Sequence, residues 1–127
     1  MDEIRISNTM ALVKKCMKKF IILYKSDQDP EEMVRNSTPE QMKSGMDVWM
    51  QWSNKAGNSI VDLGSPLGFG QIVTKTGAMK APLGVSGYSV MQAESMEELL
   101  TKLKNHPHFM TPGTSTIEVW ESMPMSM

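Results

Sequence analysis

Apolar residues fall in short runs along the chain, and their period predicts four strands. Residues 19–25 are apolar at both alternating sets of positions, which predicts a first strand that needs cover on both sides. Residues 59–63 and 85–93 predict the second and third strands, and residues 116–121 predict the last. Gln71 to Lys75 is expected to continue or extend the second strand.

The first helix is predicted by its start signal. Thr38 suits the N-cap, Pro39 the first helical position, and Gln41 can close a capping box. Gly57 is expected to end the helix, and the turn chemistry of residues 27–30 is expected to end the first strand. The expected apolar stripe consists of Met42, Met46, Trp49, Met50 and Ser53, with Trp52 beside them.

The second helix is predicted after the third strand. Ser95 and Glu98 have the spacing of a capping box. Asn105 tolerates a left-handed cap and Pro107 cannot continue a helix, so the helix is expected to stop there. Its expected buried stripe consists of Leu99, Leu100 and Leu103.

The order strand, helix, strand, strand, helix, strand predicts an α+β fold. This is the ferredoxin-like βαββαβ pattern, an antiparallel sheet with both helices on one face. The other face would stay uncovered although the first strand is apolar there, so we expect a homodimer that packs sheet to sheet. Residues 1–17 show no clear period and are interpreted as an N-terminal arm before a domain at residues 18–127.

Composition narrows the class of partner. The net charge of −1 provides no broad positive field, so no nucleic acid partner is expected. The longest apolar run, residues 20–24, is too short to span a bilayer, so no membrane partner is expected either. The single cysteine, Cys16, cannot form an intramolecular disulfide, which favours a reducing, cytoplasmic location.

Both histidines lie in one short turn, His106-Pro107-His108. Imidazole titrates near neutral pH, so His108 is a candidate acid–base group, with Asp62 as its partner. Equally, a histidine here can bind the last carbonyls of the preceding helix, and His106 is the better candidate for that cap. Two imidazoles alone make a weak metal site, so we predict no metal and no other cofactor.

Other candidate residues leave alternatives open. Asp62 follows a strand and precedes glycines, so it can orient His108 or make an Asx-turn. Trp49 and Trp52 can pack in the core, or one can stack on a flat ligand in a cleft between helix and sheet. Tyr24 and Tyr88 sit on predicted strands and can offer hydroxyls to that cleft, or be buried as core.

Three stretches resemble a known family. IVDLGSPLG (60–68), VSGYSVMQAESMEEL (85–99) and HPHFMTPGTSTIEVWESMPM (106–125) are similar to the YCII-related family, also named for a DGPF motif. The ordered match extends over residues 18–125. The resemblance implies a dimeric α+β barrel, in which two ferredoxin-like protomers pack sheet to sheet. It also implies an enzymatic role of the kind suspected for many members.

The chain departs from the family pattern at two places. The DGPF motif is absent, and the equivalent loop is residues 77–82. The early histidine of short members is missing, while Pro107, His108 and Asp62 match a branch with a Pro-His step after the second helix. Two functions stay open. One is a cofactor-free isomerase, dehydratase or lyase that acts on a small organic molecule. The other is a non-catalytic dimeric module that binds a small molecule or a protein.

Overall fold

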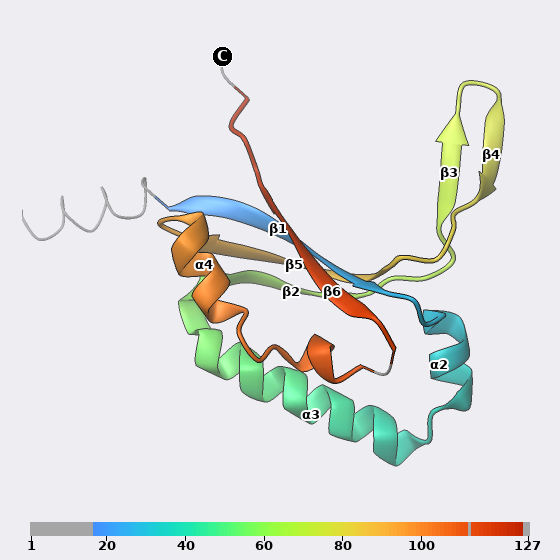
Figure 1. Ribbon diagram of the computed structural model, residues 1–127, viewed down its shortest axis with the longest axis horizontal. Coiled ribbons are helices and arrows are strands. Elements are labelled where there is room, and N and C mark those ends of the chain that lie inside the picture. The colour runs from blue at the N-terminus through green and yellow to red at the C-terminus, as the bar shows by residue number, and fades with distance from the viewer. Residues whose placement is uncertain (1–16, 112, 126–127) are drawn as a thin grey trace, which may run out of the picture.

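A four-stranded antiparallel sheet in the order β2-β5-β1-β6 forms the centre of the molecule (Figure 1). The computed structural model describes residues 17–111 and 113–125, so most of the predicted N-terminal arm lies outside it. The sheet strands are β1 (Lys18–Ser26), β2 (Ile60–Pro66), β5 (Val85–Ala93) and β6 (Ser115–Glu121), and a separate hairpin consists of β3 (Gln71–Thr74) and β4 (Gly77–Lys80). The helices are α2 (Pro30–Asn36), α3 (Pro39–Ala56) and α4 (Met96–Lys102), with short turns η1 (Gly57–Ser59) and η2 (Pro107–Met110).

The connections agree with the predicted class. β1 runs between β5 and β6 and pairs antiparallel with both, and β2 pairs antiparallel with β5. The chain is therefore α+β, and its strand order is compatible with a ferredoxin-like fold. No helix within residues 17–111 and 113–125 is both long and apolar enough to cross a membrane.

The two faces of the sheet differ in cover. Since side chains alternate along a strand, Phe20, Ile22 and Tyr24 of β1 point to the side where the helices lie, and all three are buried. We call this the covered face. Its core also contains Trp52 and Ala56 of α3, Met91 and Ala93 of β5, and Leu99 and Leu103 near α4. The opposite side, the open face, presents Ile21, Leu23, Tyr88 and Val90, which are half-buried, and Trp120, which is 58% exposed.

The start signals of both predicted helices are confirmed. Thr38 and Gln41 form the reciprocal capping box of α3, and Gly57 ends this helix with φ of 55°. The Ser95 hydroxyl accepts the backbone N–H of Glu98 at the start of α4. Asn105 takes the predicted positive φ, 58°. Local chemistry therefore fixes both helices close to their expected bounds.

One predicted segment is corrected, and one helix was not predicted. β1 ends at Ser26, as the turn chemistry of residues 27–30 predicts, but Asp29 also caps a further helix, α2, by accepting the backbone N–H of Glu31. Gln71 to Lys75 does not continue the second strand. It forms β3, which pairs only with β4 and stands away from the main sheet (Figure 1).

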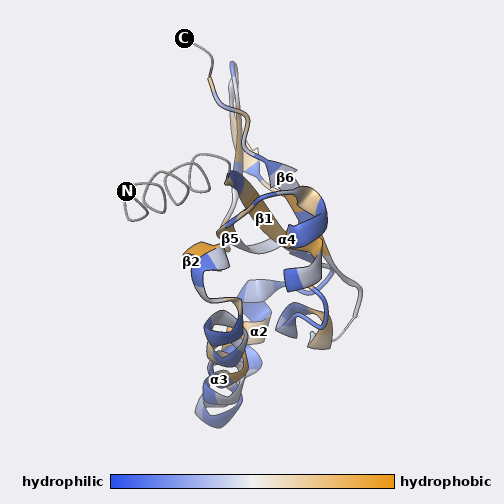
Figure 2. Ribbon diagram, turned by 90° about the vertical axis from the view of Figure 1, so that its left-hand side faces the viewer, coloured by the Kyte–Doolittle hydropathy of each residue, from blue (hydrophilic) through white to orange (hydrophobic). Residues whose placement is uncertain are grey.

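The predicted apolar stripes are only partly buried. Trp52 and Ala56, in the last turns of α3, are buried, and Trp49 packs against them. Met42, Met46 and Met50 are exposed, because the first turns of α3 extend beyond the sheet (Figure 1). In the same way Leu99 and Leu103 are buried while Leu100 is half-exposed. Figure 2 shows α3 as a largely hydrophilic helix on one side of the more hydrophobic sheet.

Candidate functional site

His106 stands at the centre of an aromatic cluster that joins β1, α3 and η2. Its ring centroid lies 4.9 Å from that of Tyr24, 4.7 Å from that of Trp49 and 4.2 Å from that of Trp52. Trp49 meets the Tyr24 ring edge-on at 4.9 Å. With His108, whose ring lies 5.3 Å from that of Tyr24, five of the seven predicted site residues are neighbours, and edge-to-face contacts of this kind add to the packing energy.

The side chain of His106 caps the turn that follows it. Its Nδ1 accepts the backbone N–H of His108 at 2.9 Å, so η2 begins at His106. Because Nδ1 is an acceptor, the neutral ring carries its hydrogen on Nε2. This Nε2 is buried and has no hydrogen-bond partner among the described residues. The predicted role for His106, a cap on the carbonyls of α4, is therefore corrected.

Trp52 performs the capping that had been expected of His106. Its indole Nε1 donates to the carbonyl of Lys102, the last residue of α4, at 3.1 Å. An unpaired carbonyl at a helix end needs such a donor when water has limited access. Trp52 therefore binds α3 to the end of α4, which is a structural use of this side chain.

His108 fixes η2 to the end of β1. Its Nε2 donates to the backbone carbonyl of Lys25 at 2.8 Å, and its ring lies 5.3 Å from that of Tyr24. Only 4% of His108 is exposed. With Nε2 bound to a carbonyl and little surface open to solvent, the ring has a structural environment rather than one that faces a substrate.

Burial also sets the protonation of the cluster. Desolvation, with repulsion from His108 adding to it, lowers the pKa of His106 to about 3. Desolvation raises the pKa of Tyr24 to about 12, against the opposing hydrogen bond to Ser89. Both rings are therefore neutral at pH 7, and neither pKa matches that of a general acid or base near neutrality.

Tyr24 begins a short buried chain of hydrogen bonds. Its hydroxyl lies 2.8 Å from the Ser89 hydroxyl, which donates its own hydrogen to the carbonyl of Leu63. The Tyr24 hydroxyl is therefore the donor to Ser89. Ser89 was not predicted, although a serine at an inward position between Gly87 and Met91 in an apolar strand was a usable signal.

Asp62 and Tyr88 lie on the other side of the sheet from the cluster. The Tyr88 hydroxyl lies 3.5 Å from Oδ2 of Asp62, and both side chains belong to the open face. Asp62 Oδ1 accepts the backbone N–H of Gly64 at 2.9 Å, which is the Asx-turn named as an alternative. The structure therefore does not bring Asp62 to His108, since the sheet separates the two.

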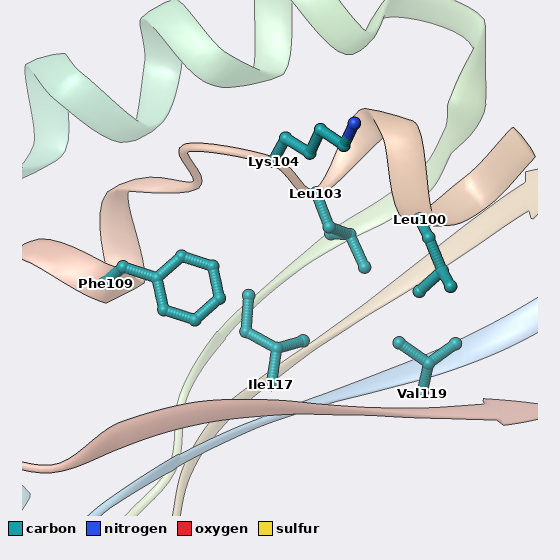
Figure 3. A pocket seen from close by; sticks show the side chains of 6 residues that line it. All are labelled: Leu100, Leu103, Lys104, Phe109, Ile117 and Val119. Atoms are coloured by element: carbon teal, nitrogen blue, oxygen red, sulfur yellow. The ribbon is translucent and has the colours of Figure 1, made fainter. Parts of the chain in front are cut away.

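A shallow hollow of about 250 Å³ opens beside the cluster, between α4, η2 and β6 (Figure 3). None of the predicted site residues lines it. Phe109, next to His108, points into it, whereas the ammonium of Lys104 points away from the other lining side chains (Figure 3). Its lining consists of Leu100, Leu103, Lys104, Phe109, Ile117 and Val119.

The described residues offer no metal site. In residues 17–111 and 113–125 no three histidine, cysteine, aspartate or glutamate side chains come together as ligands. The Glu118 carboxylate accepts the indole N–H of Trp120 at 2.7 Å and pairs with Lys25 at 3.2 Å. These two hydrogen bonds lower the pKa of the Glu118 carboxyl.

Comparison with protein-family models gives no match, and neither does comparison with curated proteins. The resemblance to the YCII-related family therefore stays a prediction from the three stretches quoted above.

Proposed function

We propose that the protein is a homodimeric, non-catalytic binding module that assembles through the open face of its sheet. One observation supports this most: within residues 17–111 and 113–125, the helices all lie on one side of the sheet, and the other face carries apolar side chains. Ile21 and Leu23 occupy its central strand, and Trp120 is exposed on the edge strand. Burying such a patch against a second copy removes apolar surface from water.

The proposed dimer is the dimeric α+β barrel that the resemblance to the YCII-related family implies. A two-fold axis would place the same patch on both sides of the interface. Three polar groups of the open face are already paired within the chain, since Lys25 contacts Glu118 and Trp120 donates to the same carboxylate. These pairs reduce the cost of removing charges from water.

Binding is favoured over catalysis by the placement of the histidines. His106 and His108 are buried, and their bonding nitrogens contact the chain's own backbone. The hollow beside Phe109 supports a small apolar ligand, because five of its six lining side chains are apolar.

A light-scattering experiment tests the module's assembly. The wild-type protein is expected at twice the 14.2 kDa chain mass at micromolar concentration. Leu23→Glu places a charge at the centre of the open face and is expected to give the monomer. Met46→Glu, on the exposed side of α3, is the matched control and should stay dimeric. A wild-type monomer of ordinary stability contradicts the proposal.

A second function, acid–base catalysis on a small organic molecule, is favoured by the Asp62–Tyr88 pair. A carboxylate and a phenol 3.5 Å apart on the open face would lie inside a sheet-to-sheet dimer. NMR titration with small carbonyl and phenolic compounds tests it. Chemical-shift changes at Tyr88 that vanish in Asp62→Asn support this site. Changes only at the histidine rings indicate instead that His108 is the acid–base group.

A further inference from the structure

The β3–β4 hairpin has no core of its own. All eight residues of its strands are exposed, and the two strands pair only with each other. Figures 1 and 2 both place the hairpin and α3 on opposite sides of the main sheet. The hairpin therefore rises on the side of the open face, where none of the described helices lies.

Its local structure is nevertheless well defined. The strands pair in register from Gln71–Lys80 to Thr74–Gly77, joined by a two-residue turn. The Thr74 hydroxyl accepts the backbone N–H of Thr76 and lies 3.3 Å from the carbonyl of Gly77. A single two-stranded hairpin is only marginally stable in water, so a regular hairpin of this kind needs cover from elsewhere.

Each side of the hairpin carries one apolar cross-strand pair. Ile72 and Met79 form a cross-strand pair on one side, and Val73 and Ala78 form one on the other. Val73 is 78% exposed and Met79 is 61% exposed. Side chains of this type on both sides of an isolated hairpin indicate a surface that another molecule buries.

Phe69 adds an apolar side chain at the base of the hairpin. It is 78% exposed and has φ of 57°, a left-handed backbone conformation that is uncommon for a bulky residue. The Glu31 carboxylate holds it there by accepting its backbone N–H at 3.1 Å. An aromatic ring held outward in a strained conformation is typical of a binding surface.

We propose that residues 67–83, which we name the hairpin arm, pack against a second copy of this chain. This segment is distinct from the N-terminal arm of residues 1–17. The inference rests on the proposed homodimer, and it adds a second contact region to the open face. The hairpin arm rises beside the open face, which is the proposed dimer interface. A second copy of the chain bound to the open face therefore contacts the hairpin arm as well. Phe69, Val73 and Met79 then become buried in the dimer.

Charged substitutions in the hairpin arm test the proposal. Val73→Asp and Met79→Asp change exposed side chains, so folding is expected to be intact by circular dichroism. Each should raise the dimer dissociation constant by at least about tenfold, measured by analytical ultracentrifugation over a dilution series. Met46→Asp, equally apolar and exposed but on α3, is the control and should leave this constant within about twofold of wild type.

The outcomes separate this inference from the dimer proposal. If the wild type is a dimer and both hairpin-arm variants have the same dimer dissociation constant as the wild type, the hairpin arm is not part of the interface. The proposal for the open face is unaffected by that result. The same holds if Met46→Asp weakens the dimer as much as the hairpin-arm variants do. A wild-type monomer overturns both proposals. Hydrogen exchange gives an independent readout, because the amides of residues 71–80 should exchange more slowly in the dimer than after dilution to monomer.

Discussion

Both faces of the sheet carry apolar side chains, but only one face has helices packed against it among the described residues. On the covered face Phe20, Ile22 and Met91 are fully buried. There the polar atoms of Tyr24 and Ser89 are paired within the chain. A buried polar group is tolerated only when it has a partner, so this face is complete within one chain.

The open face lacks that completeness. Ile21 alternates with Ile22 along one strand and differs from it only in the side to which it points. Its neighbours include Trp120, more than half exposed, and the solvent-accessible Asp62–Tyr88 pair. The comparison indicates that one chain stabilises one face, and that the second face depends on assembly.

Substitution of the two adjacent isoleucines is the strongest test of this difference. Ile22→Ala removes methyl groups from a fully buried site and should lower the free energy of unfolding by about 2–5 kcal/mol. Ile21→Ala should cost less, and its cost should grow with protein concentration because the loss falls on the dimer. Urea denaturation at two protein concentrations measures both. Equal, concentration-independent losses contradict the distinction between the faces.

Acid should destabilise the covered face through His106. Its pKa is about 3 in the folded chain against an ordinary value of 6.5. Between these values the unfolded chain holds a proton that the folded chain lacks. The free energy of unfolding should therefore fall by about 1.4 kcal/mol per pH unit as pH drops below 6.5, on top of other groups.

The variant His106→Asn isolates that contribution. Asparagine keeps an acceptor near the backbone N–H of His108 but does not titrate. We expect its free energy of unfolding, measured by urea denaturation, to fall less steeply than that of the wild type as pH drops from about 6 to about 4. The difference in slope should be about 1.4 kcal/mol per pH unit, which is the contribution of one proton. A slope equal to that of the wild type shows that His106 is not the group responsible.

The two tyrosines provide the smallest effect. Tyr24→Phe removes a buried hydroxyl that donates to Ser89 and should cost about 1 kcal/mol of folding stability. Tyr88→Phe removes a hydroxyl on the open face, 3.5 Å from a solvent-accessible carboxylate, and should cost almost nothing in the monomer. Thermal unfolding of dilute samples compares them, and a larger loss at Tyr88 argues against the assignment of the faces.

Much of the secondary structure was predictable because its signals are local. Thr38, Gln41, Ser95 and Asn105 act through backbone groups a few residues away. The helix α2 was missed although Asp29 begins it by the same kind of cap, because the segment also has the composition of a turn. The hairpin was misjudged because an apolar period of two does not specify which strand a segment pairs with.

The candidate site was only half predictable. Tyr24, Trp49, Trp52 and His106 were named one by one, and the fold does bring them together. Which residue binds which carbonyl depends on tertiary placement, so Trp52 took the role expected of His106. Asp62 and His108 were paired as candidates for acid–base chemistry, but the pleat of the sheet directs the Asp62 side chain to the opposite side.

The exposed methionines of α3 and of the hairpin arm allow the exposure of these two surfaces to be measured by oxidation. Peroxide converts an accessible thioether to a sulfoxide that mass spectrometry detects on individual peptides. The side chains of Met42, Met46 and Met79 are exposed to such a reagent, whereas Met91 is fully buried on the covered face of the sheet. If the hairpin arm is covered by a second copy, Met79 oxidises more slowly at high protein concentration while Met46 keeps its rate. The methionine content thus supplies a built-in footprint of which surfaces become covered.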